Sequence, residues 1–333
     1  MGRSMTNQVA QLQKEVTPGT AVTNAMSRPL SLKLVPSYHV EGGESINAAG
    51  YKVPTAYMIG DVWSTWNVEG IQDFNALGLI AASVFGPPVT TPVGGSSGAY
   101  THVFTPDPDA ADTLVTYTAQ FGDTVKALQA SMFAFQSLGL SIQRGQLGLT
   151  SSAISRKVDK NATLATTGVT TLSPVPVPSR GYNVYADDTW ATLGTTKLLA
   201  CYNADISNPD KFVPDAPINS AIDGFESLME AQDMDYTANF TVGFDTAGAG
   251  LIDSFENESM KFFRVKAEGP TILATVTKYS VSYDIATRIT SVGELTTAPN
   301  SPTLVLPLEG KMILDPVSGF YQKLTIVNTV ASY

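Results

Sequence analysis

Apolar and polar residues alternate along several segments of this chain, with the period of two that is typical of strands with one buried face. In residues 236–244 aromatic and aliphatic side chains occupy every second position, and Thr237, Asn239 and Thr241 lie between them. Further strands are predicted at 57–68, 100–104, 114–121, 138–142, 147–149, 261–266, 279–285, 304–308, 311–314 and 322–328, with a short one at 30–34. The pattern predicts a mainly β protein.

Helical spacing is confined to two short segments. Residues 73–85 place apolar side chains on one stripe, and the run Gly86-Pro87-Pro88 ends the helix. A second short helix is predicted at 251–258.

The chain divides into four regions by pattern. Residues 1–50 are rich in turn formers and predict an extended N-terminal arm. Pro174, Pro176 and Pro178 stiffen a connector at 173–180, because proline at every second position cannot pair in a central strand. Modules would then span 51–172 and 181–333.

Both modules show strand, helix, two strands and a hairpin in the same order. The segment Leu138-Gly139-Leu140 before Gly145 corresponds to Leu304-Val305-Leu306 before Gly310, with almost no sequence identity between the modules elsewhere. The offset of roughly 160 to 175 residues predicts a duplicated module.

Charge narrows the class of partner. Charged residues make up 15% of the chain, and the net charge is −10 with a pI of about 4.7. Nucleic-acid affinity comes from clustered Lys and Arg. Arg156-Lys157 with Lys160 is the longest basic patch, and we predict a solvated loop there. A low charge density suits surfaces covered by neighbours of the same kind.

Cellular location can be predicted from three features. Cys201 is the only cysteine, so an intrachain disulfide is impossible, and its apolar surroundings predict a buried, inert thiol. No apolar run reaches 18 residues, and the polar start has no signal-peptide pattern. Gly2 and Thr6 match a myristoylation pattern that is common by chance. We expect folding in a cytoplasm, without membrane insertion.

Nucleophile and acid–base patterns are weak. His102 alternates within a strand, His39 has no partner by spacing, and neither is placed to activate Cys201. The run Gly94-Gly95-Ser96-Ser97-Gly98 matches G-x-S-x-G, but that chemistry requires a strand before the Ser and a helix after it. A flexible loop is predicted instead.

Carboxylates give no clear site either. Asp107, Asp109 and Asp112 resemble the start of a calcium loop, but Ala111 stands at a ligand position. The pairs Asp187-Asp188 and Asp233 with Asp235 are typical of any acidic protein. Without a P-loop, dinucleotide fingerprint or zinc spacing, we predict no catalytic, cofactor-binding or metal-binding residue, no cofactor, and no enzyme activity.

Several segments together resemble the major tail tube proteins of long, non-contractile-tailed bacteriophages (siphophages). In the second half these are the runs 260–270, 279–284 and 289–293. In the first half they are 17–21, 28–31, 84–86, 100–104 and 117–123. The resemblance spans nearly the whole chain, and it rests on the order of the motifs.

The resemblance implies a phage tail tube fold, with packed antiparallel sheets beside a short helix. Three duplicated chains would form a ring with pseudo-six-fold symmetry, whereas single-module chains would require six. Rings would stack into a tube, located in the virion tail and assembled in the host cytoplasm. Partners would be further copies, the tape measure, terminator and distal tail proteins, and double-stranded DNA in transient, non-specific passage.

Under this interpretation the charge and the loops have roles. Carboxylates facing the bore would repel passing DNA. The arm before residue 50 and the loops at 87–99 and 164–178 would make ring-to-ring contacts, becoming ordered on stacking. Deletion of 163–171 would leave a folded protein that does not polymerise. Alternatives are a capsid decoration or tail terminator protein, and a carbohydrate-binding or adhesion β-sandwich. Trp63 and Trp66 fall on opposite strand faces and make no sugar platform.

Overall fold

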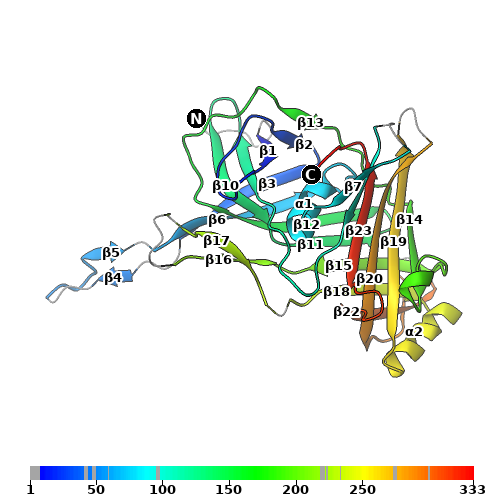
Figure 1. Cartoon of the computed structure of the whole chain (residues 1–333). Coiled ribbons are helices and arrows are strands. Elements are labelled where there is room, and N and C mark those ends of the chain that lie inside the picture. Colours follow the sequence, from blue (N-terminus) through cyan, green and yellow to red (C-terminus); the bar gives the residue numbers. More distant parts are fainter. Residues whose placement is uncertain are drawn as a thin grey trace.

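The protein is mainly β, with large antiparallel sheets and two α-helices in the part of the chain described here (Figure 1). This computed structural model describes residues 8–40, 44–46, 50–58, 60–94, 98–217, 222, 224–232, 234–272, 276–298 and 301–333. The first half contains β1 (Val9–Lys14), β2 (Ser27–Pro29), β3 (Leu32–Val40), β4 (Glu44–Ile46), β5 (Ala56–Met58), β6 (Val62–Gly70), α1 (Leu77–Phe85), β7 (Val89–Pro92), β8 (Tyr100–Phe104), β9 (Tyr117–Gly122), β10 (Ala127–Phe135), β11 (Leu138–Gln143), β12 (Gln146–Arg156) and β13 (Thr170–Leu172). The second half contains β14 (Tyr182–Asp187), η2 (Trp190–Thr192), β15 (Cys201–Asn208), β16 (Phe212–Asp215), β17 (Ser227–Glu230), β18 (Thr237–Gly243), α2 (Thr246–Glu256), β19 (Met260–Thr271), β20 (Lys278–Val292), β21 (Thr296–Thr297), β22 (Leu304–Met312) and β23 (Gln322–Asn328).

Strand pairings follow the same order in the two halves. In the first half β3 pairs with β6, β6 with β12, β1 with β9, β9 with β10, and the end of β10 with β12. In the second half β15 pairs with β18, β18 with β22, β14 with β19, β19 with β20, and the end of β20 with β22. A helix follows β6 and β18, and a hairpin, β4–β5 or β16–β17, precedes each.

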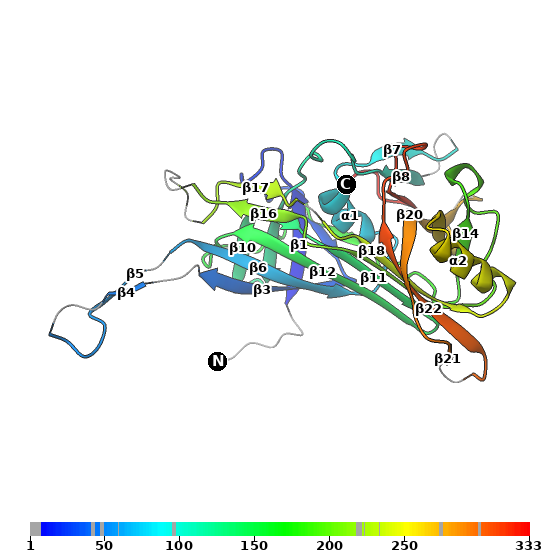
Figure 2. The ribbon, with the colours of Figure 1, turned by 90° about the horizontal axis from the view of Figure 1, so that it is seen from below.

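Two antiparallel pairings join the halves: β8 pairs with β23, and β11 pairs with β15. β11 pairs with β12 on one edge and with β15 on the other, from Leu138 opposite Asn208 to Gln143 opposite Asn203. The ladder therefore continues without a break through β3, β6, β12, β11, β15, β18, β22 and β20. Figure 2 shows β6, β12, β11 and β22 crossing the length of the molecule as this sheet.

The main core lies on one side of this sheet, where α1 is buried along its whole length. Phe74 and Leu77 contact a cluster that also includes Tyr117, Phe133 and Phe263. The rings of Phe133 and Phe135 meet edge to face at 5.0 Å between centroids, a favoured aromatic geometry. Helix α1 is therefore an internal element, not an amphipathic surface helix.

The start of α1 differs from the predicted stripe at 73–85. Asp73 is buried, and its carboxylate accepts hydrogen bonds from the amides of Asn75 and Ala76, both at 2.9 Å. These bonds hold residues 74–76 in a turn, so the helix begins at Leu77. Its predicted end at Gly86 is confirmed, where φ is +82°. Helix α2 begins earlier than predicted, because Asp245 caps it.

The predicted extended arm is wrong for the described residues. β1 lies between β9 and β2, and β3 forms one edge of the long sheet. Leu12 and Leu34 are fully buried. Turn formers such as Pro18-Gly19 only separate these strands, so their composition concealed the alternation on either side.

The proline-rich segment at 173–180 contains no strand, as predicted, but it packs on the body. The amide of Val175 donates to the Asp73 carboxylate, and that of Val177 donates to the carbonyl of Gln72 at 2.9 Å. Val177 is buried. The predicted Leu-x-Leu match is wrong, because its two segments lie in strands that are not counterparts. Residues 138–140 lie in β11, whereas 304–306 lie in β22, which corresponds to β12 in the pairings.

Candidate assembly surfaces

The long sheet has one continuous polar face. Its residues are directly opposite one another across neighbouring strands, and all are half-buried or exposed. One row consists of Lys33, Glu69, Thr150, Gly139, Ser207, Thr237, Lys311 and Arg288, and the next consists of Ser141, Asp205, Asn239, Glu309 and Ser291. We call these two rows the polar face.

Charges on the polar face are balanced and largely paired. Lys311 donates to Asp235 at 2.7 Å, and Arg288 pairs with Glu258. Glu69 accepts a hydrogen bond from Asn67 at 2.9 Å. The remainder is mostly Ser, Thr and Asn. The cations therefore have carboxylate neighbours, and the face offers no cluster of unpaired cations among the described residues.

Two hairpins stand at matching places in the chain but differ in their surroundings. β16–β17 is packed down, and Phe212, Phe225 and Leu228 contact Trp63 and Ile154 of the first half. β4–β5 instead projects from the body, as both ribbon views show (Figures 1 and 2). Its apolar side chains are open to solvent: Ile46 is 45% exposed, Tyr51 68%, Val53 65% and Tyr57 64%. We call residues 44–58 the finger, of which 44–46 and 50–58 are described.

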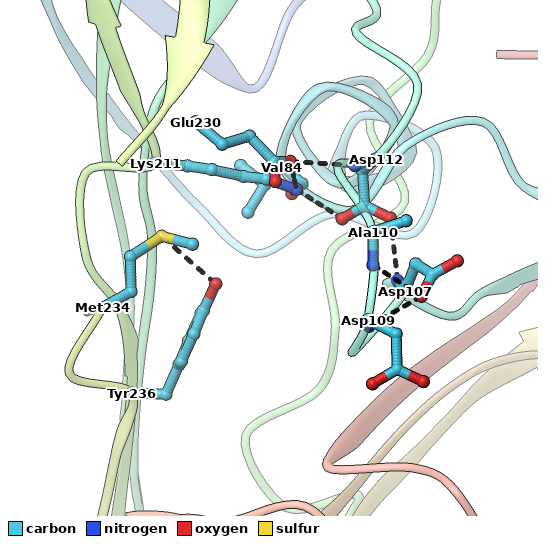
Figure 3. Close-up of polar contacts among 9 residues, drawn as sticks. All are labelled: Val84, Asp107, Asp109, Ala110, Asp112, Lys211, Glu230, Met234 and Tyr236. Atoms are coloured by element: carbon cyan, nitrogen blue, oxygen red, sulfur yellow. Dashed lines mark hydrogen bonds and ion pairs between the residues drawn. The ribbon is translucent and has the colours of Figure 1, made fainter. Parts of the chain in front are cut away.

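A buried lysine fixes the packed hairpin (Figure 3). Lys211 directly precedes β16, and its ammonium donates to the carbonyl of Val84 at 2.8 Å, at the C-terminal end of α1. It also contacts the carboxylates of Asp112 at 2.5 Å and Glu230 at 2.9 Å. Burial raises the pKa of Asp112, and the hydrogen bond from Lys211 opposes that shift. The ammonium thus ties the second-half hairpin to the first half.

An apolar depression of about 690 Å³ lies in the second half, around the start of β19. Trp190, Met260 and Phe262 line it, together with Val317, which is 92% exposed. The Trp190 ring meets Phe262 edge to face at 6.0 Å. Asp188 and Asp315 also line it. We call it the Trp190 pocket.

The candidate acid–base and thiol residues lie in separate strands. His102 is fully buried in β8 and hydrogen-bonds to Thr90, Asn328 and the carbonyl of Val330. Burial lowers its pKa despite the latter two contacts. His39 lies in β3 opposite Trp63, and its side chain is not among those described. Cys201 is half-buried, and burial raises the pKa of its thiol to about 12.

The candidate carboxylates mostly organise their own loops. Asp107 accepts from the amides of Asp109 and Ala110, and Asp112 accepts from the amide of Asp107 at 2.8 Å. Asp187 is buried, which opposes ionisation, but hydrogen bonds from Thr196, Thr195 and Gly194 outweigh that effect and lower its pKa.

The remaining acidic pairs and the G-x-S-x-G run are placed as follows. Asp188 pairs with Lys261, and Asp235 with Lys311. Asp233 lies outside the described residues, as do residues 95–97 with Ser96. The run 94–98 connects the paired strands β7 and β8, so the order required by a nucleophile elbow is absent around it.

The predicted solvated loop fits Lys157 and Lys160, which are exposed after the end of β12, but not Arg156. Arg156 ends β12, and its guanidinium donates to the carbonyls of Gly19, Phe225 and Glu226. Lys160 stands 4.8 Å from the centre of the Tyr38 ring. These cations join segments of the chain.

The expectation that residues 164–178 become ordered only on stacking is also wrong. Leu164 is buried, and Ala165 exchanges hydrogen bonds with Gln120 and Gln11 at 2.8 and 2.9 Å. Deletion of 163–171 would remove these contacts from β1 and β9, so it no longer tests polymerisation alone.

Among the described residues, no group of three or more His, Cys, Asp or Glu could hold a metal ion. No helix in the described ranges is long and apolar enough to cross a membrane. No protein-family model matches the sequence, and no curated protein is similar enough to count as a relative.

Sequence reasoning missed Lys211 and Trp190. Lys211 sits in an ordinary polar context, Asn208-Pro209-Asp210-Lys211, and two of its three partners, Asp112 and Val84, are 99 and 127 residues away. Trp190 follows Asp187-Asp188-Thr189, which resembles a solvated turn. An isolated large aromatic residue in a polar loop was the one available signal.

Proposed function

We propose that this chain is a structural protein of a bacteriophage tail, which polymerises as stacked rings into the tail tube and forms a conduit for DNA. The observation that carries the proposal is the joint between β11 and β15, combined with the repeated order of pairings. One half already binds the other half edge to edge, and the same kind of contact between chains would extend the sheet indefinitely or close it into a ring.

Two edge strands favour this arrangement: β3 at one end of the long sheet, and β21, which pairs with β22 beside β20 at the other end. β3 has the place in the first half that β15 has in the second, and it pairs only with β6 among the described residues. β21, which precedes β22 as β11 precedes β12, pairs only with β22 in the same described set. An open edge is a template for another strand. β21 of one copy would therefore pair with β3 of the next.

A head-to-tail contact of this kind closes into a ring when the rotation between copies allows it. Because each chain carries two matching halves, three chains would give a ring with pseudo-six-fold symmetry. The polar face would then line the bore. Its hydroxyl and amide groups, and its cations beside carboxylates, leave few sites at which DNA phosphates would be retained.

The direct test is electron microscopy of the purified full-length protein, with native mass spectrometry of any ring. The proposal expects rings of three chains and tubes with a regular axial repeat. Rings that never stack would favour a terminator or decoration protein. A protein that stays monomeric at millimolar concentration would refute the proposal.

The bore assignment has its own test in phage particles. Glu69, Asp205 and Glu309 are replaced by Lys, singly and together, and DNA ejection is timed. Each substitution changes the charge by two on every copy, so ejection slows if these side chains face the DNA. Unchanged ejection with intact tails would place the polar face elsewhere.

A further inference from the structure

The finger and the Trp190 pocket are two uncovered apolar surfaces on opposite sides of one molecule. The finger projects beyond β3 and β6, on the side of the molecule opposite β19 and α2 (Figure 1). Residues of η2 and of the start of β19 line the pocket. Neither can be covered by the other within one chain. We infer that the finger of one copy docks in the Trp190 pocket of the next copy, an inference that rests on the proposed ring.

The packed hairpin β16–β17 provides the precedent inside the chain. It follows β15, and it covers the side of the first half that faces away from the main core, where Met132, Ala134 and Ile154 form an apolar floor. The hairpin reaches that position because β15, which directly precedes it, pairs with β11. A hairpin that follows an edge-paired strand is thus carried onto the neighbouring module.

The second half has an equivalent floor without a hairpin on it. Ala286 lies in β20 of the β19–β20 pair, and Ala134 lies in β10 of the matching β9–β10 pair. Both residues face away from the main core. Ala286 clusters with Leu193 and Phe262, beside Trp190 and Met260. In the first half Phe212 and Phe225 cover the floor, whereas in the second half the surface is the open Trp190 pocket.

The finger is the counterpart of β16–β17, because it follows β3 as that hairpin follows β15. If β3 pairs with β21 of the next copy, the finger is carried onto the second half of that copy. Tyr51, Val53 and Tyr57 would then replace water around Trp190 and Val317. The charges agree with this direction, since Lys52 is in the finger, and Asp188, which lines the pocket, remains 81% exposed despite its ion pair with Lys261.

Substitutions in the full-length protein test the contact. Val53→Asp and Val317→Asp each place a charge in the proposed interface and should raise the protein concentration needed for assembly at least ten-fold. Val276→Asp is the matched control, because Val276 is 99% exposed and lies in the turn at the far end of β19, about 35 Å from its start. It should assemble as the wild type does, and far-UV circular dichroism should show all three variants folded.

Cross-linking identifies the partners directly. In a Cys201→Ser background, Tyr51→Cys or Val53→Cys is combined with Ala191→Cys or Val317→Cys, and a short bis-maleimide is added. The inference expects covalent dimers and trimers from at least one combination and none from single-cysteine variants. Tubes that assemble normally from Val53→Asp and Val317→Asp, without cross-links, would overturn the inference and leave the tail tube proposal standing.

Trp190 gives an independent readout, because Trp63 and Trp66 are only 8% and 2% exposed. Acrylamide should quench Trp190 fluorescence in the monomer and much less in the assembled wild type. If Trp190 stays accessible in tubes, or if a saccharide protects it in the monomer, the pocket has another occupant and the inference is wrong. Discrete cross-linked trimers that never form tubes would support the docking and count against the tail tube.

Discussion

Replacement of Lys211 by Met should destabilise the protein strongly. Met has a similar length but no charge, so the substitution leaves the packing of the stem nearly unchanged and removes the ammonium. The side chain of Lys211 is 4% exposed, and those of Asp112 and Glu230 are 11% and 22% exposed. The substitution therefore takes the ammonium away from the carbonyl of Val84 and from two largely shielded carboxylates, which keep the amides of Asp107 and Asp112 as donors.

The magnitude follows from that loss. Removing one partner of a buried ion pair costs about 3–5 kcal/mol, because the remaining charge is uncompensated. Asp112 can take up a proton, since burial already raises its pKa, and Glu230 retains partial access to water. We therefore expect the lower part of this range, about 3 kcal/mol, in the free energy of unfolding of the unit that contains β16 and α1.

Urea unfolding followed by tryptophan fluorescence provides the assay, because Trp63 belongs to the cluster that β16–β17 covers. The control is Lys211→Met combined with Asp112→Asn and Glu230→Gln, which removes the unpaired charges and should recover part of the lost stability. Lys261→Met, in an exposed ion pair with Asp188, should cost less than about 1 kcal/mol. A Lys211→Met protein that loses less than about 1 kcal/mol would refute the argument that the ammonium fixes the hairpin.

Three further perturbations probe other contacts. Glu15→Gln should lower the free energy of unfolding in urea by about 2 kcal/mol, because the buried carboxylate accepts four hydrogen bonds, including one from the amide of Met132, whose φ is +52°. An unchanged free energy would show that the backbone at Met132 does not depend on Glu15. Gly78→Ala should cost at least as much as Glu15→Gln, because its methyl group would lie 2.2 Å from the Tyr333 ring. If that methyl group displaces the ring from its hydrogen bonds with Asn75 and Asn328, Tyr333→Phe should cost less in the Gly78→Ala protein than in the wild type. Burial lowers the pKa of His102 below its ordinary value near 6.5, so the unfolded chain binds a proton first as pH falls. The free energy of unfolding should therefore decrease as pH falls below 6.5, and it should decrease less steeply with pH in His102→Gln. Equal slopes in the two proteins would assign the loss to other groups.

Strands with a regular period of two could be predicted from the sequence, because their alternation reflects one buried and one solvated face. The predicted strands at 100–104 and 322–328 match β8 and β23, and 236–244 contains β18. The opposite placement of Trp63 and Trp66 is confirmed, since they belong to different clusters. These strands carry their burial pattern in their own residues.

Strands that are buried on both faces gave no such signal. Ala127–Phe135 reads as small and apolar residues without a period, because β10 faces α1 on one side and the β16–β17 hairpin on the other. The register shift between Ala130 and Phe133 also breaks the alternation. β19 continues past residue 266, where the predicted strand ends, and its pairing with β20 shifts between Glu268 and Thr271. Pairing between distant segments decided these elements.

The candidate surfaces were less predictable than the strands, because they depend on which elements are left uncovered. Nothing in residues 44–58 distinguishes an exposed finger from the hairpin at 212–230 that packs on the body. Phe212 and Phe225 find an apolar floor within reach, supplied by β6, β10 and β12 of the same chain. The equivalent floor around Trp190 is supplied by the half that the finger cannot reach. The difference lies in the topology and not in the composition of the hairpins.

This topology separates folding from assembly. Because both halves are in one chain, the β11–β15 joint forms at an effective concentration in the millimolar range or above, and it needs no partner. The joint between β21 and β3 requires a second molecule, so it forms only when the free protein concentration is sufficient. A chain cut within the loop at 188–200 would make three pairings intermolecular, namely β11–β15, β8–β23 and β14–β19. Because these pairings and the shared main core hold the fragments together, we expect them to stay associated on dilution to micromolar concentration. Fragments that separate there would show that the contact between the halves depends on the covalent link.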